Sequence, residues 1–385
     1  MWKHALSTIV CSHCKANLNL ISVEEKNTEI SEKTFENKLL SSNTHYISWV
    51  ETGILYCENC KLLFPIYRGV PILLKFKTVQ AELGLAACPN EKKNDFLVKG
   101  FHLPFGQASP GEEFVSASFS VEWENYDYGP VIWIASTSER LETFRGECGL
   151  KDGDLCGKRF IEIGCGLGIL TNEAATGLGA EAWGMDISNA VFRATSQFRN
   201  NPNVHFVQAS VFAAPFKAQS FDFLYSHGVL HHTWDTKEAI TEAAKLLQRN
   251  GGCMYIWLYG YDDVRINLVR RVVYSVETVT RPLIARMPSF IATAVLLPLI
   301  PFYQIASFFG KRSGTHGSIY TPHQALHAAR DRFSPLYAHR QEYEEVAGWL
   351  KELGFTTIQR VSRTEVSVSW GLAIERNIAI RGSVV

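Results

Sequence analysis

Residues 160–170 read FIEIGCGLGIL, and this stretch decides the fold. A short apolar run that contains Glu162 leads into glycines at alternate positions, Gly164, Gly166 and Gly168. Glycine lets a backbone approach a ligand closely, so the pattern predicts a ligand-binding turn after a buried strand. A dinucleotide site typically reads G-x-G-x-x-G, whereas this turn reads G-x-G-x-G and has an acid within its strand. The nature of the ligand therefore depends on the residues around the turn.

The sequence after this turn alternates between strand-like and helix-like segments. Strands are expected at 159–164, 180–188, 203–210 and 253–260, and a strand together with its following loop at 220–232. Helices are expected at 170–179, 189–200 and 236–250. This β-α-β rhythm predicts a parallel sheet covered by helices, with the ligand at the carboxyl ends of the strands. Near the end of the chain, the segments 354–363 and 372–380 predict an antiparallel hairpin at the edge of the sheet.

The acids near the turn indicate the class of cofactor. Asp186 ends the second strand, where a carboxylate accepts hydrogen bonds from ribose hydroxyls, so an adenosine cofactor of any kind fits. Glu162 disfavours a pyrophosphate, because two negative charges would lie close together. S-adenosylmethionine has no phosphate and carries an ammonium and a sulfonium, so the sequence favours this cofactor. A third feature is the stretch FDFLYSHGVLHH at residues 221–232.

Together, the glycine loop, FDFLYSHGVLHH and the late hairpin resemble the class I S-adenosylmethionine-dependent methyltransferases, specifically the methyltransferase type 11 group. The resemblance covers residues 116 to about 380 and implies an α/β fold with a Rossmann-like seven-stranded sheet. It also implies a helical cap insertion at about 261–318. The cofactor-binding residues that it implies are Glu162, Gly164, Cys165, Gly166, Gly168, Asp186, Ile187 and His227.

The resemblance also assigns parts of the cofactor to these residues. The glycines would approach the methionine portion, Asp186 would hold the ribose, and Ile187 would pack on the adenine. At the end of the third strand the family often has an aspartate that accepts the adenine amino group, whereas this sequence has Ser210. We expect the Ser210 hydroxyl and the backbone of Val211 to bind there instead, with a weaker grip.

Four more aromatic residues and two histidines are expected near the substrates. Trp123 and Tyr126 lie in 118–129, which resembles a helix that closes over the cofactor in several bacterial members; alternatively, both are core residues. His231 and His232 follow the fourth strand, at positions that face the methyl-transfer site in the family. Either could be a general base or a shaping residue, and at least one is expected to be structural. The candidate acceptor residues after the fifth strand are Tyr259 and Tyr261.

The N-terminal part contains two C-x-x-C pairs, Cys11 with Cys14 and Cys57 with Cys60. Two such pairs complete a tetrahedral zinc site, although four free thiols are the alternative. The following segment, KLLFPIYRGVPILL at 61–74, resembles the zinc ribbon of the small activator subunit of tRNA and protein methyltransferases. We therefore expect a zinc-ribbon domain at 1–77, a linker at 78–115 and the catalytic domain at 116–385. A closed site with four thiolates leaves no open position, so the zinc is expected to support folding or docking.

Charge and hydropathy limit the partners. The chain has 38 Lys plus Arg residues and 38 Asp plus Glu residues, so its formal net charge is zero. No excess of basic residues indicates a nucleic-acid partner. The first residues do not have the pattern of a signal peptide, and the cytoplasm is the expected location. One uncharged segment, FIATAVLLPLIPFYQIASFF at 290–309, is about as long as a membrane span. It predicts either a pair of buried or lid helices, or an element that contacts a membrane or a lipid-like substrate.

These features favour methyl transfer to a small-molecule or lipid-like acceptor, in secondary metabolism or cell-surface biosynthesis. Two alternatives remain at this stage. The same fold could transfer the aminocarboxypropyl group or close an azetidine ring, and either reaction releases methylthioadenosine. The chain could also be a binding module without catalysis. The sequence determines neither the acceptor nor the oligomeric state.

Overall fold

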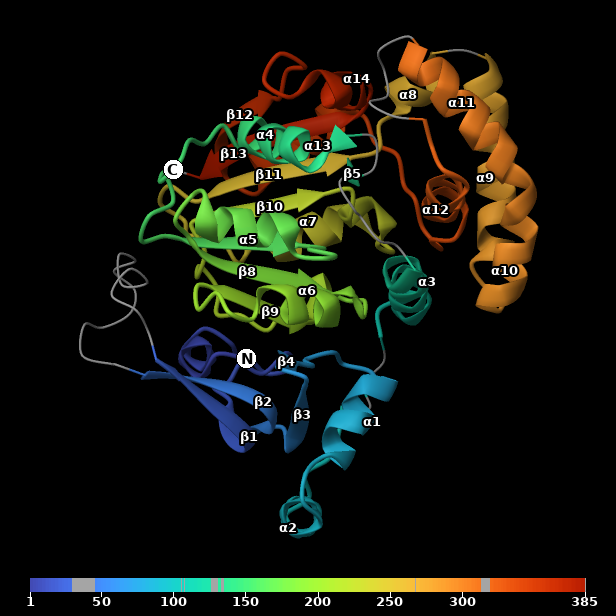
Figure 1. The fold of residues 1–385 in the computed structure, drawn as a ribbon. Coiled ribbons are helices and arrows are strands. Elements are labelled where there is room, and N and C mark those ends of the chain that lie inside the picture. Colours follow the sequence, from blue (N-terminus) through green and yellow to red (C-terminus); the bar gives the residue numbers. More distant parts are fainter. Residues whose placement is uncertain are drawn as a thin grey trace. The chain divides into compact units, whose positions relative to one another are not determined.

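The computed structural model describes residues 1–29, 46–104, 106, 108–125, 131–132, 135–266, 268–312 and 319–384 (Figure 1). The chain divides into two compact units, each built from several segments. Unit 1 contains Met1–Ser109, Asp152–Leu224 and Thr241–Gly252, and unit 2 contains Pro110–Lys151, Tyr225–Ile240 and Cys253–Val385. The main sheet has seven strands in the order β12-β13-β11-β10-β7-β8-β9, which confirms the expected α/β fold class.

The N-terminal part of unit 1 is a small antiparallel sheet. Its strands follow the order β1-β2-β3-β4, with bounds Asn19–Glu29, Tyr46–Cys57, Leu62–Tyr67 and Val70–Pro71. A 3-10 helix, η1, precedes them at Lys3–Ser7. Strand β1 ends at Glu29, and residues 30–45 lie outside the described residues.

The expected linker at 78–115 is structured where it is described. Helix α1 spans Val79–Ala86 and begins at Thr78, whose hydroxyl accepts the amide of Ala81. Helix α2 spans Asn90–Val98. Cys88 and Phe96 are buried here with Phe101 and with residues of β2 and β3. Segments α1 and α2 therefore pack on the small antiparallel sheet, because their few apolar side chains share an apolar core with β2 and β3.

The ribbon joins strand β9 within unit 1. The amide of Leu73 donates to the carbonyl of Gln208 at 2.8 Å, so the segment after β4 pairs with the end of β9 (Val204–Gln208). Val10 donates to the carbonyl of Pro215, and the Lys15 ammonium donates to the carbonyl of Ala214. An edge strand otherwise exposes unpaired backbone groups, and the ribbon covers this edge.

The rest of unit 1 has the expected β-α-β rhythm. Strands β7 (Arg159–Ile163), β8 (Glu181–Asp186) and β9 pair in parallel. Helices α5 (Ile169–Thr176) and α6 (Ala190–Phe198) connect them. Every residue of β8 and β9 is buried, as expected for strands covered on both faces.

Unit 2 contains the antiparallel part of the sheet. Strand β13 (Ile378–Val384) pairs antiparallel with both β11 (Cys253–Leu258) and β12 (Phe355–Arg360), which confirms the late hairpin. The expected strand at 372–380 is wrong in its first half, because α14 spans Val368–Arg376. Its buried residues Trp370 and Ile374 are four positions apart, the spacing of a helix face.

Other elements of unit 2 surround these strands. Their bounds are Glu112–Asn125 for α3, Val131–Ile132 for β5, Ala135–Ser136 for β6, Thr137–Cys148 for α4, Leu230–His232 for the 3-10 helix η4 and Tyr343–Glu352 for α13. Strand β10 spans Phe223–His227. Helix α7 (Thr236–Ala244) and strand β10 each have residues in both units. Helix α13 buries Val346, Ala347 and Leu350 on one face.

The cap insertion is a group of helices in unit 2 that continues beyond the expected end at 318. Its elements are α8 (Tyr261–Arg265), α9 (Leu268–Ile284), α10 (Ser289–Leu296), η5 (Leu297–Leu299), α11 (Ile300–Arg312) and α12 (Pro322–Phe333). Figure 1 shows α9, α10 and α11 grouped around α12. A small apolar core joins them through Ile284, Leu296 and Phe333.

The apolar segment 290–309 is not a pair of buried helices. Phe290 is 73% exposed and Phe302 is 69% exposed. Among the described residues, Ser289–Arg312 is the one helical stretch with the length and hydropathy of a membrane span, which alone is weak evidence. Only 11% of its most apolar window is buried, so the alternative of buried helices is excluded.

Candidate functional site

The glycine loop of unit 1 has the backbone that the sequence predicts. Gly164, Gly166 and Gly168 have φ angles of 76°, 50° and 72°, a region that side chains disfavour. At Gly168 a Cβ atom would lie 2.5 Å from the Phe206 ring, so only glycine fits. Glu162 accepts the Thr171 hydroxyl at 2.5 Å, which ties β7 to α5 around this loop. The loop is therefore a tight turn held from both of its ends.

Asp186 holds the glycine loop directly. Its Oδ2 accepts the Gly166 amide at 2.8 Å, and its Oδ1 accepts the amide and hydroxyl of Ser188 at 2.8 and 2.7 Å. Burial raises the pKa of Asp186, and the hydrogen bonds from Ser188 and Gly166 act in the opposite direction. Sequence reasoning expected this carboxylate to hold a ribose. The structure adds that it fixes the backbone of the turn.

The residues that follow β9 differ from the sequence expectation. The Ser210 hydroxyl accepts the amide of Phe212 at 3.1 Å and caps the 3-10 helix η3, which spans Val211–Ala213. Gln208, which sequence reasoning missed, is fully buried, and its amide donates to Ile187 and Asn189. Its Oε1 has no hydrogen-bond donor among the described residues. An orphaned acceptor of this kind suits an adenine amino group, so this end of unit 1 fits an adenosine cofactor.

Unit 2 contains a buried charged network that ends at His227. Glu147 Oε2 accepts hydrogen bonds from Arg140 at 3.1 Å and from the Tyr225 hydroxyl at 2.5 Å. His227 Nδ1 lies 3.0 Å from Glu147 Oε1, and its ring stacks on Trp257 at 4.7 Å. Burial raises the pKa of Glu147, but Arg140 and His227 outweigh it and bring this pKa to about 2. The carboxylate is therefore charged and orients His227.

Sequence reasoning found His227 but missed its partners. Arg140 and Glu147 are seven positions apart on α4, so they lie on one face of that helix, two turns apart. Ion pairs along a helix usually join residues three or four positions apart, so a spacing of seven gives no sequence signal. Only the fold shows that these two residues are buried, at 4% and 0% exposure.

His231, His232 and Tyr259 lie together in unit 2. The His231 ring is 4.0 Å from the Tyr259 ring and 4.1 Å from the His232 ring. His231 is fully buried, and neither ring nitrogen has a hydrogen-bond partner among the described residues. Burial lowers its pKa well below the usual value. The His231 ring is therefore neutral and packs against two other rings, and its role stays a prediction.

His232 has a defined hydrogen bond. Its Nδ1 lies 2.7 Å from the carbonyl oxygen of Tyr337, an acceptor, so Nδ1 carries the proton and donates. Burial lowers the pKa of His232 to about 3, although this hydrogen bond acts in the opposite direction. In the neutral ring Nε2 is then the unprotonated nitrogen. This is the tautomer in which Nε2 can accept a proton.

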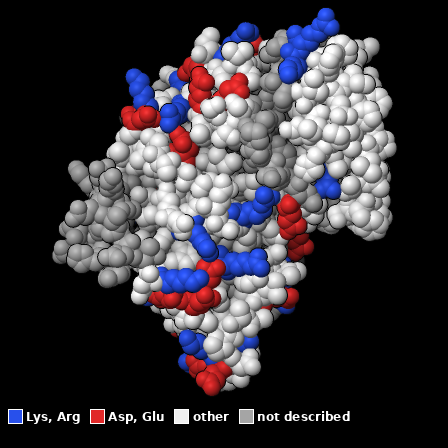
Figure 2. Space-filling view, viewed as in Figure 1, with Lys and Arg blue, Asp and Glu red and all other residues white. Residues whose placement is uncertain are grey.

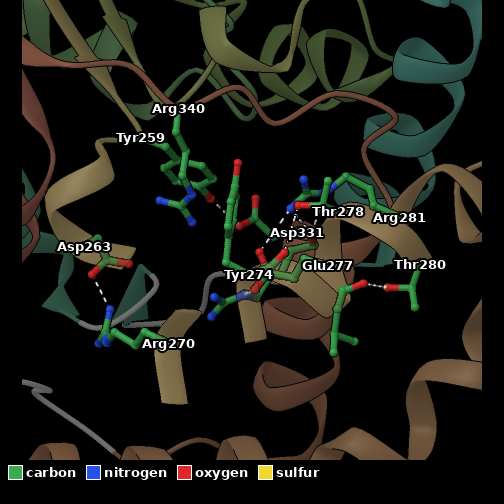
Figure 3. Close-up of polar contacts among 12 residues, drawn as sticks. Tyr259, Asp263, Arg270, Tyr274, Glu277, Thr278, Thr280, Arg281, Asp331 and Arg340 are labelled. Carbon is green, nitrogen blue, oxygen red and sulfur yellow. Dashed lines mark hydrogen bonds and ion pairs between the residues drawn. The ribbon is translucent and has the colours of Figure 1, made fainter. Parts of the chain in front are cut away.

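Tyr259 contacts the charged residues of the cap. Its hydroxyl donates to Asp331 at 3.2 Å, and the Arg340 guanidinium lies 5.0 Å from its ring centre (Figure 3). Burial raises the pKa of Asp331 to about 6. Tyr261, the other tyrosine that the sequence singled out, is not part of this cluster in the contacts described. Its ring lies 6.5 Å from Tyr274 and 5.5 Å from the Arg265 guanidinium.

The expected lid residues lie on or just after α3. The Trp123 ring is 5.8 Å from His327 on α12, and Tyr126 lies outside the described residues. Phe119, one turn before Trp123, packs against His232 with ring centres 5.4 Å apart. The helix that the sequence predicted as a lid therefore contacts a predicted catalytic residue through an aromatic side chain that sequence reasoning did not select.

A cavity of about 170 Å³ lies between α3 and the cap helices. Phe114 and Val121 line it from α3, and Ile284 and Met287 line it from the end of α9 and the turn that follows. Glu122 also reaches it, with both carboxylate oxygens buried and without a hydrogen bond. Burial raises the pKa of Glu122 well above its usual value, although Arg330 acts in the opposite direction. Arg286 and Arg330 also line the cavity, so its wall combines apolar side chains with charged groups.

The four cysteines of the ribbon meet as predicted. The sulfur atoms of Cys11, Cys14, Cys57 and Cys60 all lie within 4.8 Å of one another, and those of Cys14 and Cys57 are 3.5 Å apart. Thiolates bound tetrahedrally to zinc at 2.3 Å lie about 3.8 Å from each other. The four residues therefore fit a structural zinc ion, which would join the two knuckles.

Comparisons with known proteins match one family to the region of the glycine loop and another to the cysteine-containing N-terminal region. Residues 161–255 match the family described as methyltransferase domain, and residues 3–69 match the Trm112p-like protein family. The O-methyltransferase rstn1 of Aspergillus nomiae is 30% identical over 33% of this chain and 56% of its own length. The ubiquinone biosynthesis O-methyltransferase of Paraburkholderia phymatum is 35% identical over 26% of this chain and 44% of its own length. The chain thus spans about half the length of these curated relatives.

Two solved structures also match parts of this chain. One is the Haemonchus contortus phosphoethanolamine N-methyltransferase 2 with S-adenosylhomocysteine, at 14% identity, 73% and 62% coverage of the two chains and a TM-score of 0.42. The other is the Haloferax volcanii Trm112 methyltransferase activator in complex with a methyltransferase, at 14% identity, 70% and 97% coverage and a TM-score of 0.38.

Proposed function

Since this chain carries a methyltransferase domain and a Trm112p-like domain, we propose that it transfers a methyl group from S-adenosylmethionine to a small-molecule or lipid-like acceptor. The observation that carries the proposal is the glycine loop, with three glycines at positive φ and the Gly166 amide bound to Asp186. S-adenosylmethionine, when bound, supplies a methyl group that its sulfonium has already activated. The protein then has to position the acceptor and exclude water.

Residues of unit 1 would hold the cofactor. The glycine loop admits the methionine portion, Asp186 lies where a ribose is held, and Ile187 follows it where an adenine packs. Ser210 is occupied as a helix cap, so the buried Oε1 of Gln208 is the better acceptor for the adenine amino group. Because Gln208 also donates to the Ile187 carbonyl, it would align both adenine contacts.

The proposed acceptor atom is the oxygen of a hydroxyl group. The two curated relatives named above are O-methyltransferases, and an alcohol or phenol must lose its proton as its oxygen is methylated. His232 would accept a hydrogen bond from this hydroxyl at Nε2, because Nδ1–H is held by the Tyr337 carbonyl. A pKa of about 3 makes Nε2 a weak base, so Asp331, whose pKa is about 6, is the better acceptor of the proton. Tyr259, which donates to Asp331, would position the acceptor beside it.

The proposed acceptor class is apolar or amphiphilic. The cavity beside α3 combines apolar side chains with Glu122 and with two basic residues, Arg286 and Arg330. A lipid-like or secondary-metabolite substrate that also carries a polar end fits such surroundings. We accordingly place the activity in secondary metabolism or cell-surface biosynthesis, in the cytoplasm and in association with a membrane.

The identity of the nucleoside product tests this function. Purified protein is incubated with S-adenosylmethionine and a panel of apolar hydroxyl compounds, and the nucleosides are identified by mass spectrometry. S-adenosylhomocysteine is expected, and methylthioadenosine would instead indicate aminocarboxypropyl transfer or azetidine formation. Cofactor binding measured by calorimetry without any product would support a binding module. His232→Gln should lower kcat with hydroxyl acceptors and leave cofactor affinity unchanged, whereas His323→Gln, exposed on α12, should change neither.

A further inference from the structure

Helix α9 has its apolar face turned outward. Its exposed apolar residues recur every three or four positions, so they form one stripe along the helix. The exposed fractions are 74% for Leu268, 55% for Val272, 50% for Val276, 69% for Val279 and 62% for Leu283. A helix on the surface of a soluble protein normally turns this stripe toward the core. The arrangement of α9 is therefore the reverse of the usual one.

The inward face of α9 is charged instead. Glu277 is fully buried and forms ion pairs with Arg281, at 3.3 Å, and with Arg332 on α12. Arg281 also donates to the Arg332 carbonyl at 3.1 and 3.0 Å. Figure 3 shows Glu277 and Arg281 side by side. Buried charges are costly unless they are paired in this way. Because the interior holds the polar face by specific bonds, α9 cannot rotate its valines inward without breaking them.

Helices α10 and α11 continue the same outward apolar surface. Phe290, Phe302 and Phe309 are 73%, 69% and 62% exposed, and Ile305 is 56% exposed. On α11 the polar side chains again point inward. Ser307 is buried and its hydroxyl accepts the amide of Tyr320, while Gln304 donates to the Tyr320 carbonyl. We name the exposed apolar side of α9, α10 and α11 the outer cap face.

The charges around the outer cap face have one sign. Residues 268–312 contain six basic residues and one acid, and that acid is the buried Glu277. Arg271 and Arg286 are exposed, and Lys311 and Arg312 are exposed at the end of α11. Figure 2 shows a broad, almost uncharged surface over α9 to α11, with basic side chains at its upper edge. An apolar surface edged by basic side chains complements an anionic lipid bilayer.

We propose that the outer cap face binds a lipid bilayer that contains anionic lipids and inserts into one leaflet without crossing it. The interruption at Leu297–Leu299 argues against a continuous span, because the stretch consists of α10, η5 and α11. The inner sides of these helices also pack on α12, so lipid cannot surround them. This inference does not depend on which group the enzyme transfers, and its test measures lipid binding alone.

Flotation of the full-length protein with vesicles tests the proposal. The protein should float with vesicles of mixed phosphatidylcholine and phosphatidylglycerol, and less with phosphatidylcholine alone or at high salt. Phe302→Asp combined with Val279→Asp should weaken partitioning by roughly tenfold or more, because two apolar side chains no longer enter the leaflet. Arg271→Glu combined with Lys311→Glu should remove the preference for anionic vesicles.

The matched control is Val368→Asp, which places the same charge at an apolar residue of unit 2 that is 85% exposed and lies outside the outer cap face. It should float like the unaltered protein. Circular dichroism checks that each variant is folded, as expected because the altered side chains point into solvent. Unchanged flotation of the Phe302 and Val279 variant overturns the proposal. The proposal is also overturned if the unaltered protein forms a dimer without lipid and this variant does not, because a second copy of the chain would then cover the outer cap face. Resistance to alkaline extraction from vesicles would also overturn it, in favour of a spanning helix.

Discussion

The amide of Leu73 donates a 2.8 Å hydrogen bond to the carbonyl oxygen of Gln208, which joins the ribbon to edge strand β9. The side chain of the same glutamine donates to the Ile187 carbonyl at 3.3 Å and to Asn189 at 3.2 Å. Gln208 thus links the ribbon to the segment that follows Asp186 within unit 1. Folding of the ribbon is therefore expected to affect cofactor binding as well as stability.

Removing one zinc ligand tests this link. Cys57→Ser should lose the metal, measured by mass spectrometry of the intact protein under native conditions, and should lower stability by more than about 3 kcal/mol. Cofactor affinity measured by calorimetry should fall as well, because Leu73 would no longer hold Gln208. The control is Cys156→Ser, an exposed cysteine outside the cluster, which should keep the metal. Full cofactor affinity in metal-free Cys57→Ser would contradict the link.

The bond between Asp186 and the glycine loop gives a second prediction. Asp186→Ala leaves the buried Gly166 amide without its acceptor, which costs about 1–3 kcal/mol and should weaken cofactor binding roughly tenfold to a hundredfold. Asp222→Ala is matched, since Asp222 also accepts a backbone amide, that of Arg159, at 2.8 Å. It should lower the melting temperature and leave the dissociation constant of the cofactor unchanged. Equal effects of the two variants on this constant would refute a role of Asp186 in the loop.

The buried network at Glu147 should dominate the stability of unit 2. Glu147→Gln leaves the Arg140 guanidinium buried without a countercharge, so we expect a loss of about 3–5 kcal/mol in urea unfolding. Glu352→Gln breaks an exposed ion pair with Lys237 and should cost less than about 1 kcal/mol. If both variants lowered the free energy of unfolding by the same small amount, the buried pair Arg140–Glu147 would not contribute to stability more than an exposed pair.

The buried His232 predicts how stability changes with pH. Its folded pKa is about 3, whereas the unfolded ring is protonated below about pH 6.5, so the unfolded state binds more protons between these values. Stability should therefore fall as the pH is lowered, by about 1.4 kcal/mol per pH unit for this group. The raised pKa of Asp331 acts in the opposite direction between about pH 4 and 6, so differences between variants are the proper measure.

Thermal unfolding between pH 8 and pH 5 separates the contributions of His232 and Asp331 to the pH dependence of stability. His232→Gln should make the decline in stability below pH 6.5 shallower than in the unaltered protein. Parallel curves for the unaltered protein and His232→Gln would show that His232 titrates with its ordinary pKa in the folded state.

Local sequence patterns predicted much of the fold and part of the site. The glycine loop, the two C-x-x-C pairs and the parallel strands were all expected, because turn residues and apolar periodicity act over a few positions. Helices α1 and α2 were not expected, because the core around Cys88 and Phe96 forms with distant strands. Gln208 carried no signal, since a glutamine at the end of a strand becomes informative only when its buried oxygen lacks a partner.

The sequence by itself determined the local elements and the chemistry that they carry: glycines where φ is positive, thiols in pairs, and an apolar stripe along α9. Only the tertiary structure decided which way that stripe faces. A helical period defines two sides but not their surroundings, and here the ion pairs of Glu277 with Arg281 and Arg332 hold the charged side inward. The Arg140–Glu147–His227 network depended on the fold for the same reason, since contacts between distant segments arise only when the chain is packed.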